Sequence, residues 1–269
     1  MNIRIGYELI FQCAQATPMI LVLNVHQSRV ADLLNPDLLQ TQPVVPLSTY
    51  SDGFGNWCTR LVAPPGRIQI TTDAVIRDSG LAEPIAPEAW ECPVEALPED
   101  TLVYLLQSRY CDTDHLSEFA WQRFGAVQPG WSRVQAIVDF VHQHLQFGYA
   151  YARPTKSASQ AMSEGNGVCR DFAHLGIALC RCLNIPARYC TGYLGDIGVP
   201  WNPAPMDFSG WMEAYIGGAW HVFDPRHNHR RIGRILMARG RDAADVAIST
   251  AFGPNTLESF NVWTYEVTA

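Results

Sequence analysis

Cys169 is the residue whose position best suits covalent chemistry. It follows the glycine-flanked turn 165–168 and begins a segment, 169–183, in which apolar residues recur at helical spacing. At the start of a helix, unpaired backbone N–H groups and the positive end of the helix dipole favour a thiolate over a thiol. The same N–H groups can hold the oxyanion that forms when a thiolate attacks a carbonyl. The sequence therefore predicts a nucleophile at Cys169, the alternative being a buried structural cysteine.

Two residues further along the chain are candidates for acid–base chemistry. Asp224 ends a predicted strand and precedes Pro225, a context that also suits an ordinary turn. His227 lies three residues beyond Asp224 and is the first candidate for moving the thiol proton. His174 lies about 140° round the predicted helix from Cys169, so we expect it to face away and to pack in the core.

Four more residues are expected near this chemistry. Tyr149 could add an O–H donor to an oxyanion site, the alternative being aromatic packing in the core. Trp201 lies in a proline-rich loop, where a side chain is well placed to line a cleft. Arg226 and Arg230 could each hold a carboxylate through two parallel N–H bonds. They predict an anionic peptide or a small acidic amide as substrate, the alternative being a solvated surface turn.

Composition narrows the function classes. The chain has 269 residues, of which 48% are hydrophobic and 17% charged, so it can build sizeable cores. Its formal net charge is −7, and no basic run is interleaved with aromatics, which argues against nucleic acid as a partner. The start of the chain lacks a basic stretch followed by a long apolar run, so we expect no targeting segment. The apolar run 19–25 is too short to span a bilayer, so we expect no membrane partner.

The cysteines indicate neither disulfides nor a metal. Eight cysteines show no framework spacing, and a chain of this size needs none, so a reduced, cytoplasmic setting is expected. Cys180 and Cys182 lie about 200° apart on a helix and cannot share an ion. Like Cys190, they are predicted to behave as small hydrophobic residues. We expect no metal and no cofactor.

The first part of the chain reads as strands. Apolar and β-branched runs are separated by turn residues, as in a β-sandwich. They occupy residues 3–11, 19–24, 60–63 and 67–76. We predict a β-rich domain over 1–82 and a linker rich in Pro and Glu over 83–98.

The second part reads as α+β. Helical spacing is predicted at 102–108, 115–123, 132–147 and 169–183. Ser132 and Gln135 form a candidate capping box for the third helix. Strands are predicted at 187–194, 211–216, 219–224, 232–238 and 259–267, with a loop over 195–208. We expect one domain, 99–269, in which an antiparallel sheet packs on a central helix.

Five motifs in the region 157–228 resemble the transglutaminase-like superfamily. In order, they are Gly-x-Cys opening a helix, an Ile-Pro-Ala-Arg exit, a Gly-Tyr strand, a strand matching His-Ala-Trp, and a Trp-x-x-x-Asp-Pro strand. The first residues, including the segment 50–56, are similar to the β-rich N-terminal region of bacterial members. The resemblance implies a papain-like core with a Cys-His-Asp triad.

Cys169 and Asp224 match the first and third members of that triad, but Ser209 stands where the family keeps its histidine. A serine hydroxyl is a poor base near neutral pH. Three interpretations remain open. Another base such as His227 could serve, catalysis could be lost while a binding cleft is kept, or Ser209 could orient a water or a substrate group.

The resemblance implies a cysteine peptidase or amidase rather than a cross-linking enzyme. We expect Cys169 to attack a peptide-type amide, so the partner is a peptide or small amide substrate. The alternative is a pseudoenzyme or peptide-binding module of the same fold, which could assist a peptide-ligating partner protein. The oligomeric state is not predicted.

Overall fold

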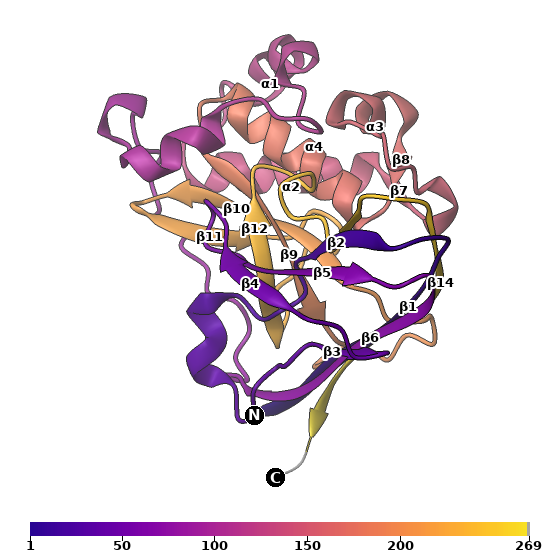
Figure 1. Ribbon diagram of the computed structural model, residues 1–269. Helices are drawn as coiled ribbons and strands as arrows, with labels where there is room; N and C mark the ends of the chain where they lie inside the picture. Colours follow the sequence, from indigo (N-terminus) through magenta and orange to yellow (C-terminus); the bar gives the residue numbers. More distant parts are fainter. Residues whose placement is uncertain (268–269) are drawn as a thin grey trace.

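The computed structural model describes residues 1–267 and contains two strand-rich parts joined side by side (Figure 1). One part is a sandwich of two four-stranded antiparallel sheets, ordered β14-β1-β6-β3 and β13-β2-β5-β4. Its strands are β1 (Asn2–Cys13), β2 (Thr17–Leu21), β3 (Gln40–Gln42), β4 (Ser48–Ser51), β5 (Trp57–Ala63), β6 (Gly66–Arg77), β13 (Ser249–Ala251) and β14 (Asn255–Val267). The predicted early strands are therefore present, and the β-sandwich is confirmed.

The last strand of the chain belongs to the sandwich, not to the second part. β14 pairs with β1 along its whole length, from Asn2 opposite Val267 to Cys13 opposite Asn255. A Cβ at Gly6 would lie 2.4 Å from the Trp263 ring, so this pairing also needs glycine. The expected range 99–269 thus includes a strand, β14, that pairs with the N-terminal strand β1 and not with the sheet of the second part. A strand's hydrophobic pattern identifies the strand but does not identify its pairing partner.

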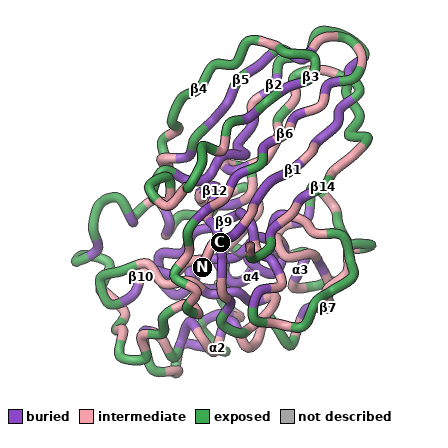
Figure 2. Tube along the Cα trace, turned by 90° about the horizontal axis from the view of Figure 1, so that it is seen from below, coloured by how far each residue is buried: buried purple, intermediate pink, exposed green. Residues whose placement is uncertain are grey.

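The second part packs one sheet against a helix. The sheet is ordered β11-β10-β9-β12. Its strands are β9 (Ala187–Leu194), β10 (Ser209–Ile216), β11 (Ala219–Phe223) and β12 (Arg234–Gly240). Helix α4 (Cys169–Cys182) lies across it, and Figure 2 shows α4 and β9 buried along most of their length. A Cβ on Gly176 of α4 would lie 2.6 Å from the Met212 sulfur, so glycine lets the helix approach the sheet closely.

Three other α-helices pack against α4, and short 3-10 segments lie between the strands and helices of both parts. The α-helices are α1 (Ser117–Phe124), α2 (Trp131–His144) and α3 (Ala158–Glu164). The 3-10 turns are η1 (Gln27–Asp32), η2 (Val94–Ala96), η3 (Glu99–Leu105), η4 (Thr113–His115) and η5 (Tyr149–Tyr151). The short pair β7 (Gln146–Phe147) and β8 (Asn166–Gly167) is parallel. No described helix combines the length and apolar character needed to cross a bilayer.

The predicted helices occur, but their types and ends differ in places. The first predicted helix is a 3-10 segment, η3, rather than an α-helix. The helix predicted over 132–147 ends at His144, before β7. The capping box predicted at Ser132 is absent, because α2 begins one residue earlier, with Gly130 as its N-cap. A capping box does occur at α3, where Ser157 Oγ accepts from the Gln160 backbone and Ser157 N donates to the Gln160 side chain.

The segment predicted as a linker is fixed to the second part. Trp90 O accepts from Gly217 N at 2.7 Å, and Ala89 O accepts from Trp131 N at 2.9 Å. The Glu91 carboxylate pairs with Arg133 at 2.8 Å. These contacts tie residues 83–98 to helix α2 and to the β10–β11 turn, so the segment is part of the scaffold.

Buried polar groups join the sandwich to β12. Asn56 is fully buried, and its side chain accepts from Arg239 N and donates to Arg239 O, both at 2.8 Å. His26 N donates to Leu236 O at 3.0 Å, and the His26 ring is fully buried at the same junction. Buried Asn56 makes its two hydrogen bonds with Arg239 only when the sandwich and β12 are in this arrangement. Asn56 therefore fixes the two parts in register.

His26 makes stability depend on pH. Burial and the charges of Arg239 and Arg188 lower its pKa to about 4, against smaller opposite effects of Glu213 and Asp52. The unfolded chain binds this proton below about pH 6.5, whereas the folded chain binds it only near pH 4. Stability should therefore be complete above pH 6.5 and fall by up to about 3 kcal/mol as the pH drops to 4.

Urea unfolding of His26→Asn between pH 4 and 7 measures this contribution. Asparagine can still accept the Ser28 N–H but carries no titrating ring. The variant should lose part of the pH dependence and keep the part due to the buried His174, whose pKa is also lowered by burial. An unchanged slope would show that His26 does not titrate at the junction.

Candidate active site

A carboxylate, that of Asp171, caps the N-terminus of α4. Asp171 Oδ2 accepts from Val168 N at 2.9 Å, and the Asp171 side chain is buried. A Cβ at Gly167 would lie 2.6 Å from Asp171 Cβ, which explains the glycine two residues before Cys169. The N–H groups of Cys169 and Arg170 open the helix and so have no acceptor within it.

Cys169 is half-buried and lines a cavity of about 660 Å³. The sulfur is therefore not enclosed in packed hydrocarbon. Apolar surface dominates the walls, which come from the start of α4 and the region before it, from β9, from the end of the loop before β10, and from the segment 243–249. The lining residues are Tyr110, Tyr149, Ala152, Arg153, Pro154, Val168, Cys169, Arg170, Tyr189, Thr191, Asp207, Phe208, Ala243, Val246, Ala247, Ile248 and Ser249.

The Cys169 thiol does not ionise by itself as easily as the helix start suggested. Burial raises its pKa, and the charge of Arg226 lowers it. The carboxylate of Asp207 raises it, the Gly210 N–H lowers it, and Asp224 raises it further. The net shift is upward, so the expected spontaneous thiolate is not supported. Removing the thiol proton requires a base.

Asp224 is buried at the end of β11 and joins three groups. Its Oδ1 accepts from the N–H groups of Arg226 and His227, each at 3.1 Å. Its Oδ2 contacts His227 Nδ1 at 2.8 Å and accepts from Arg234 Nη2 at 2.9 Å. Burial alone would raise the pKa of Asp224, but Arg234 and His227 lower it below its usual range. Asp224 therefore stays ionised and orients the His227 ring through Nδ1.

A second cavity of about 250 Å³ adjoins the first and is lined by His227, Ser209 and Arg226. Tyr149, Asp207 and Phe208 line both cavities, so they form the wall between Cys169 and His227. The Ser209 Oγ is buried and has no hydrogen-bond partner within residues 1–267. It therefore forms no hydrogen bond with a base or a carboxylate of these residues.

The structure brings Tyr149 and Arg226 to this site. Tyr149 is 51% exposed and lines both cavities, so the alternative of core packing is wrong. The Arg226 guanidinium lies 3.8 Å from the Phe147 ring centroid, at the edge of the second cavity. Both side chains are within the region where a substrate would meet Cys169.

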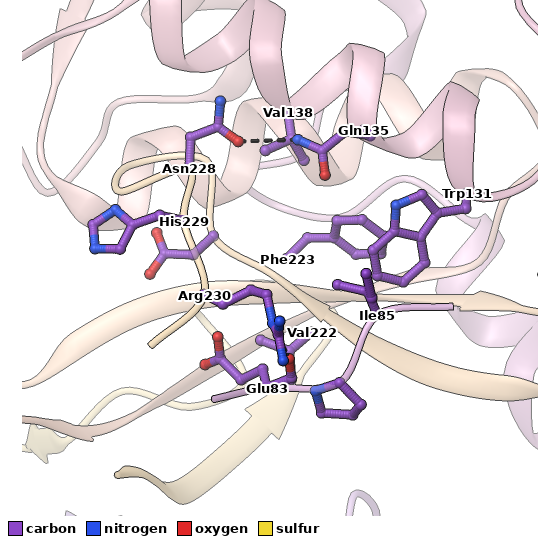
Figure 3. Close-up of a pocket in the computed structure, with 12 residues that line it drawn as sticks. Glu83, Ile85, Trp131, Gln135, Val138, Val222, Phe223, Asn228, His229 and Arg230 are labelled. Atoms are coloured by element: carbon purple, nitrogen blue, oxygen red, sulfur yellow. Dashed lines mark hydrogen bonds between the residues drawn. The ribbon is translucent and has the colours of Figure 1, made fainter. Parts of the chain in front are cut away.

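Arg230 and Trp201 lie elsewhere. Arg230 lines a separate cavity of about 200 Å³ behind Asp224, which Figure 3 shows together with Trp131 and His229. Its guanidinium donates to the carbonyls of Glu83 and Ala82, so it holds the segment 83–98. Trp201 is 76% exposed and lines neither cavity at the site.

The remaining predicted positions have structural roles. His174 is fully buried, and its Nε2 accepts from Ala243 N at 3.1 Å, which agrees with the expected core histidine. Within residues 1–267, no cluster of three or more His, Cys, Asp or Glu side chains could hold a metal.

Two residues at the site were missed, Asp207 and Tyr189. Asp207 lies two residues before Ser209, so in an extended chain both side chains point to the same side, and this spacing could have identified it. Burial raises the pKa of Asp207, which Arg226 partly offsets. Nothing in the sequence distinguishes Tyr189, because a tyrosine in a buried strand is predicted to be a core residue.

Known proteins support one family assignment. The model of the transglutaminase-like superfamily matches residues 120–225. A solved structure from Cytophaga hutchinsonii, described as a "Putative Cysteine Protease", is 31% identical, covers 100% of this chain and 91% of its own, and superposes with a TM-score of 0.86. The chain belongs to the transglutaminase-like superfamily.

This membership confirms the fold expected from the motifs, a transglutaminase-like core with a strand-rich N-terminal region. An uncharacterized protein of Mycobacterium leprae (strain TN) is 25% identical over 215 residues, which is 78% of this chain and 77% of the relative. Another from Mycobacterium tuberculosis (strain ATCC 25618 / H37Rv) is 28% identical over 221 residues, covering 74% and 69%. Neither relative adds information on activity.

Two charge changes should move the Cys169 pKa in opposite directions. Arg226→Gln removes a cation that favours the thiolate and should raise the pKa. Asp207→Asn removes an anion that disfavours the thiolate and should lower it. The pH dependence of iodoacetamide alkylation at Cys169 measures both, with the other seven cysteines followed separately by peptide mass spectrometry.

Arg230→Gln is the matched control, because it removes an arginine four residues away that lies in the other cavity. Its alkylation profile should equal that of the unchanged protein. If Arg226→Gln and Asp207→Asn shift the profile in the same direction, the charges at the sulfur are not those described.

Proposed function

We propose that this protein is a thiol-dependent amide hydrolase or acyl transferase with Cys169 as its nucleophile. The observation that carries the proposal is the placement of Cys169. It begins a helix, opens on a cavity of about 660 Å³, and adjoins a second cavity with a hydrogen-bonded Asp224–His227 pair. Membership of a superfamily of cysteine acyl-transfer enzymes agrees with this chemistry.

In the proposed reaction, His227 takes the Cys169 proton and the thiolate attacks the carbonyl carbon of the amide. The new S–C bond pushes the carbonyl electrons onto oxygen, and N–H groups at the start of α4 hold that charge. Collapse of the intermediate breaks the C–N bond, and His227 returns the proton to the leaving amine. Water then attacks the thioester, with His227 as the base.

His227 can do this because Asp224 fixes its Nδ1, which leaves Nε2 free for proton transfer. His227 lines the cavity next to Cys169 rather than the same one, so transfer runs through one bridging water. The arrangement replaces the histidine that the family keeps at position 209 with one from the turn after β11.

The proposed substrate is a peptide or small amide with an anionic group. Arg226 lies at the wall shared by the two cavities and can bind a carboxylate. The apolar walls of the larger cavity suit a hydrophobic side chain beside the reacting carbonyl. We propose hydrolysis rather than cross-linking, and the eight free cysteines suit a cytoplasmic, reducing setting.

Cys169→Ala should abolish turnover of an activated acyl substrate, and His227→Gln should lower it about 100-fold or more, the usual contribution of a general base. p-Nitrophenyl acetate, followed by release of p-nitrophenol, is the probe. His115→Gln is the control, because His115 is an exposed histidine of η4 that lines neither cavity at the site. Equal rates for the unchanged protein and Cys169→Ala would contradict the proposal.

A binding-only protein of the same fold is the second candidate, and the upward shift of the Cys169 pKa together with Ser209 favours it. Ser209→His separates the two. If His227 already serves as the base, the new histidine should give little gain in hydrolysis. A gain of 100-fold or more would show that the natural site lacks a base and would favour the binding role.

A further inference from the structure

Tyr189 presents a phenol to the cavity that holds the nucleophile. It lies on β9, is 5% exposed and lines the same cavity as Cys169. None of the hydrogen bonds made by residues 1–267 involves its hydroxyl. The ring is buried, but the hydroxyl oxygen is not among the buried side-chain atoms that lack a partner, so it is reached from the cavity and is placed to meet a ligand.

Gly210 makes room for this hydroxyl. A Cβ at position 210 would lie 2.5 Å from Tyr189 Oη, closer than non-bonded atoms can approach. The Gly210 N–H also lies close enough to the sulfur to lower the pKa of the Cys169 thiol. The sulfur, the Gly210 backbone and the Tyr189 hydroxyl are therefore neighbours. The superfamily pattern has alanine at this position, and the alanine Cβ would collide with the hydroxyl. In this chain the hydroxyl can therefore occupy its place only because residue 210 is glycine.

The hydroxyl is a donor rather than a base. Burial raises the pKa of Tyr189 well above its usual value, so the O–H keeps its proton throughout the working pH range. A neutral O–H can donate a hydrogen bond to a developing negative charge. Tyr149, at 51% exposure, lies in a wetter part of the site where such a bond contributes less.

We propose that Tyr189 is a catalytic residue whose O–H donates to the oxyanion formed when Cys169 attacks the substrate carbonyl. The inference rests on the proposed function. The S–C bond forms, the carbonyl π electrons move to oxygen, and Tyr189 and the helix N–H groups hold that oxygen. No proton leaves Tyr189. When the intermediate collapses, the electrons return, the C–N bond breaks, and the amine takes its proton from His227.

Tyr189→Phe tests the proposal by removing one oxygen atom and little else. The rate constant of acylation by p-nitrophenyl acetate should fall roughly 100-fold, the usual effect of losing one oxyanion donor. KM should change little, because the bond is made mainly in the transition state. Tyr193→Phe is the matched control, since Tyr193 lies on the same strand, is buried, and lines neither cavity at the site.

Alkylation by iodoacetamide distinguishes this role from a structural one. That reaction displaces iodide from carbon and forms no oxyanion, so Tyr189→Phe should leave the rate and pH profile of Cys169 alkylation unchanged. A shifted profile would show that the hydroxyl acts on the thiolate instead and would overturn the proposal. An unchanged acylation rate would overturn it as well.

Gly210→Ala supplies an independent variant. Its methyl group should displace the hydroxyl and reduce acylation nearly as much as Tyr189→Phe. In the double variant the two losses should not add, because both remove the same interaction. Additive losses would contradict the proposal. If Cys169→Ala hydrolyses p-nitrophenyl acetate as fast as the unchanged protein, the proposed function itself is wrong. If the rate depends on Cys169 but is the same in Tyr189→Phe, only this inference is rejected.

Discussion

The buried carboxylate of Asp224 is the constraint on which the site depends. An unpaired carboxylate in this position would be costly, so it must have compensating donors. Arg234 supplies the charge and is itself held by Glu83 and by the face of the Trp211 ring at 4.6 Å. His227 uses the remaining capacity of the same oxygen. A single network therefore positions His227, keeps Asp224 ionised and holds the segment 83–98 in place through Glu83.

The sandwich contributes to the site without supplying a predicted catalytic group. The segment 243–249 forms one wall of the larger cavity and leads directly into β13, an edge strand of the sandwich. Ile248 lines the cavity and its carbonyl accepts from Val22 N at 3.1 Å. Together with the hydrogen bonds between the Asn56 side chain and the Arg239 backbone, these contacts fix the cavity wall relative to Cys169. The sandwich therefore shapes the cavity that Cys169 lines.

Two neighbouring differences from the superfamily pattern have different structural consequences. Ser209 leaves the position of the usual histidine without a base, and Asp224 binds the histidine of the following turn instead. Gly210 lets a tyrosine hydroxyl approach the nucleophile. The first change alone would suggest an inactive protein. Together with the placement of His227 and Tyr189, it is the basis for the proposal that other groups carry the proton and hold the oxyanion in this chain.

The sequence by itself determined the local elements and the family. The strands predicted at 187–194 and 219–224, the helix that begins at Cys169 and the motif order follow from periodicity, turn residues and short-range spacing, which act within about 15 residues. Only the tertiary structure decided which distant segments meet. It paired β14 with β1, placed Arg230 behind Asp224 rather than at Cys169, and brought Asp207 and Tyr189 beside the sulfur. It also reversed the expected direction of the Cys169 pKa shift, because burial and neighbouring charges depend on packing in three dimensions and not on position in the chain.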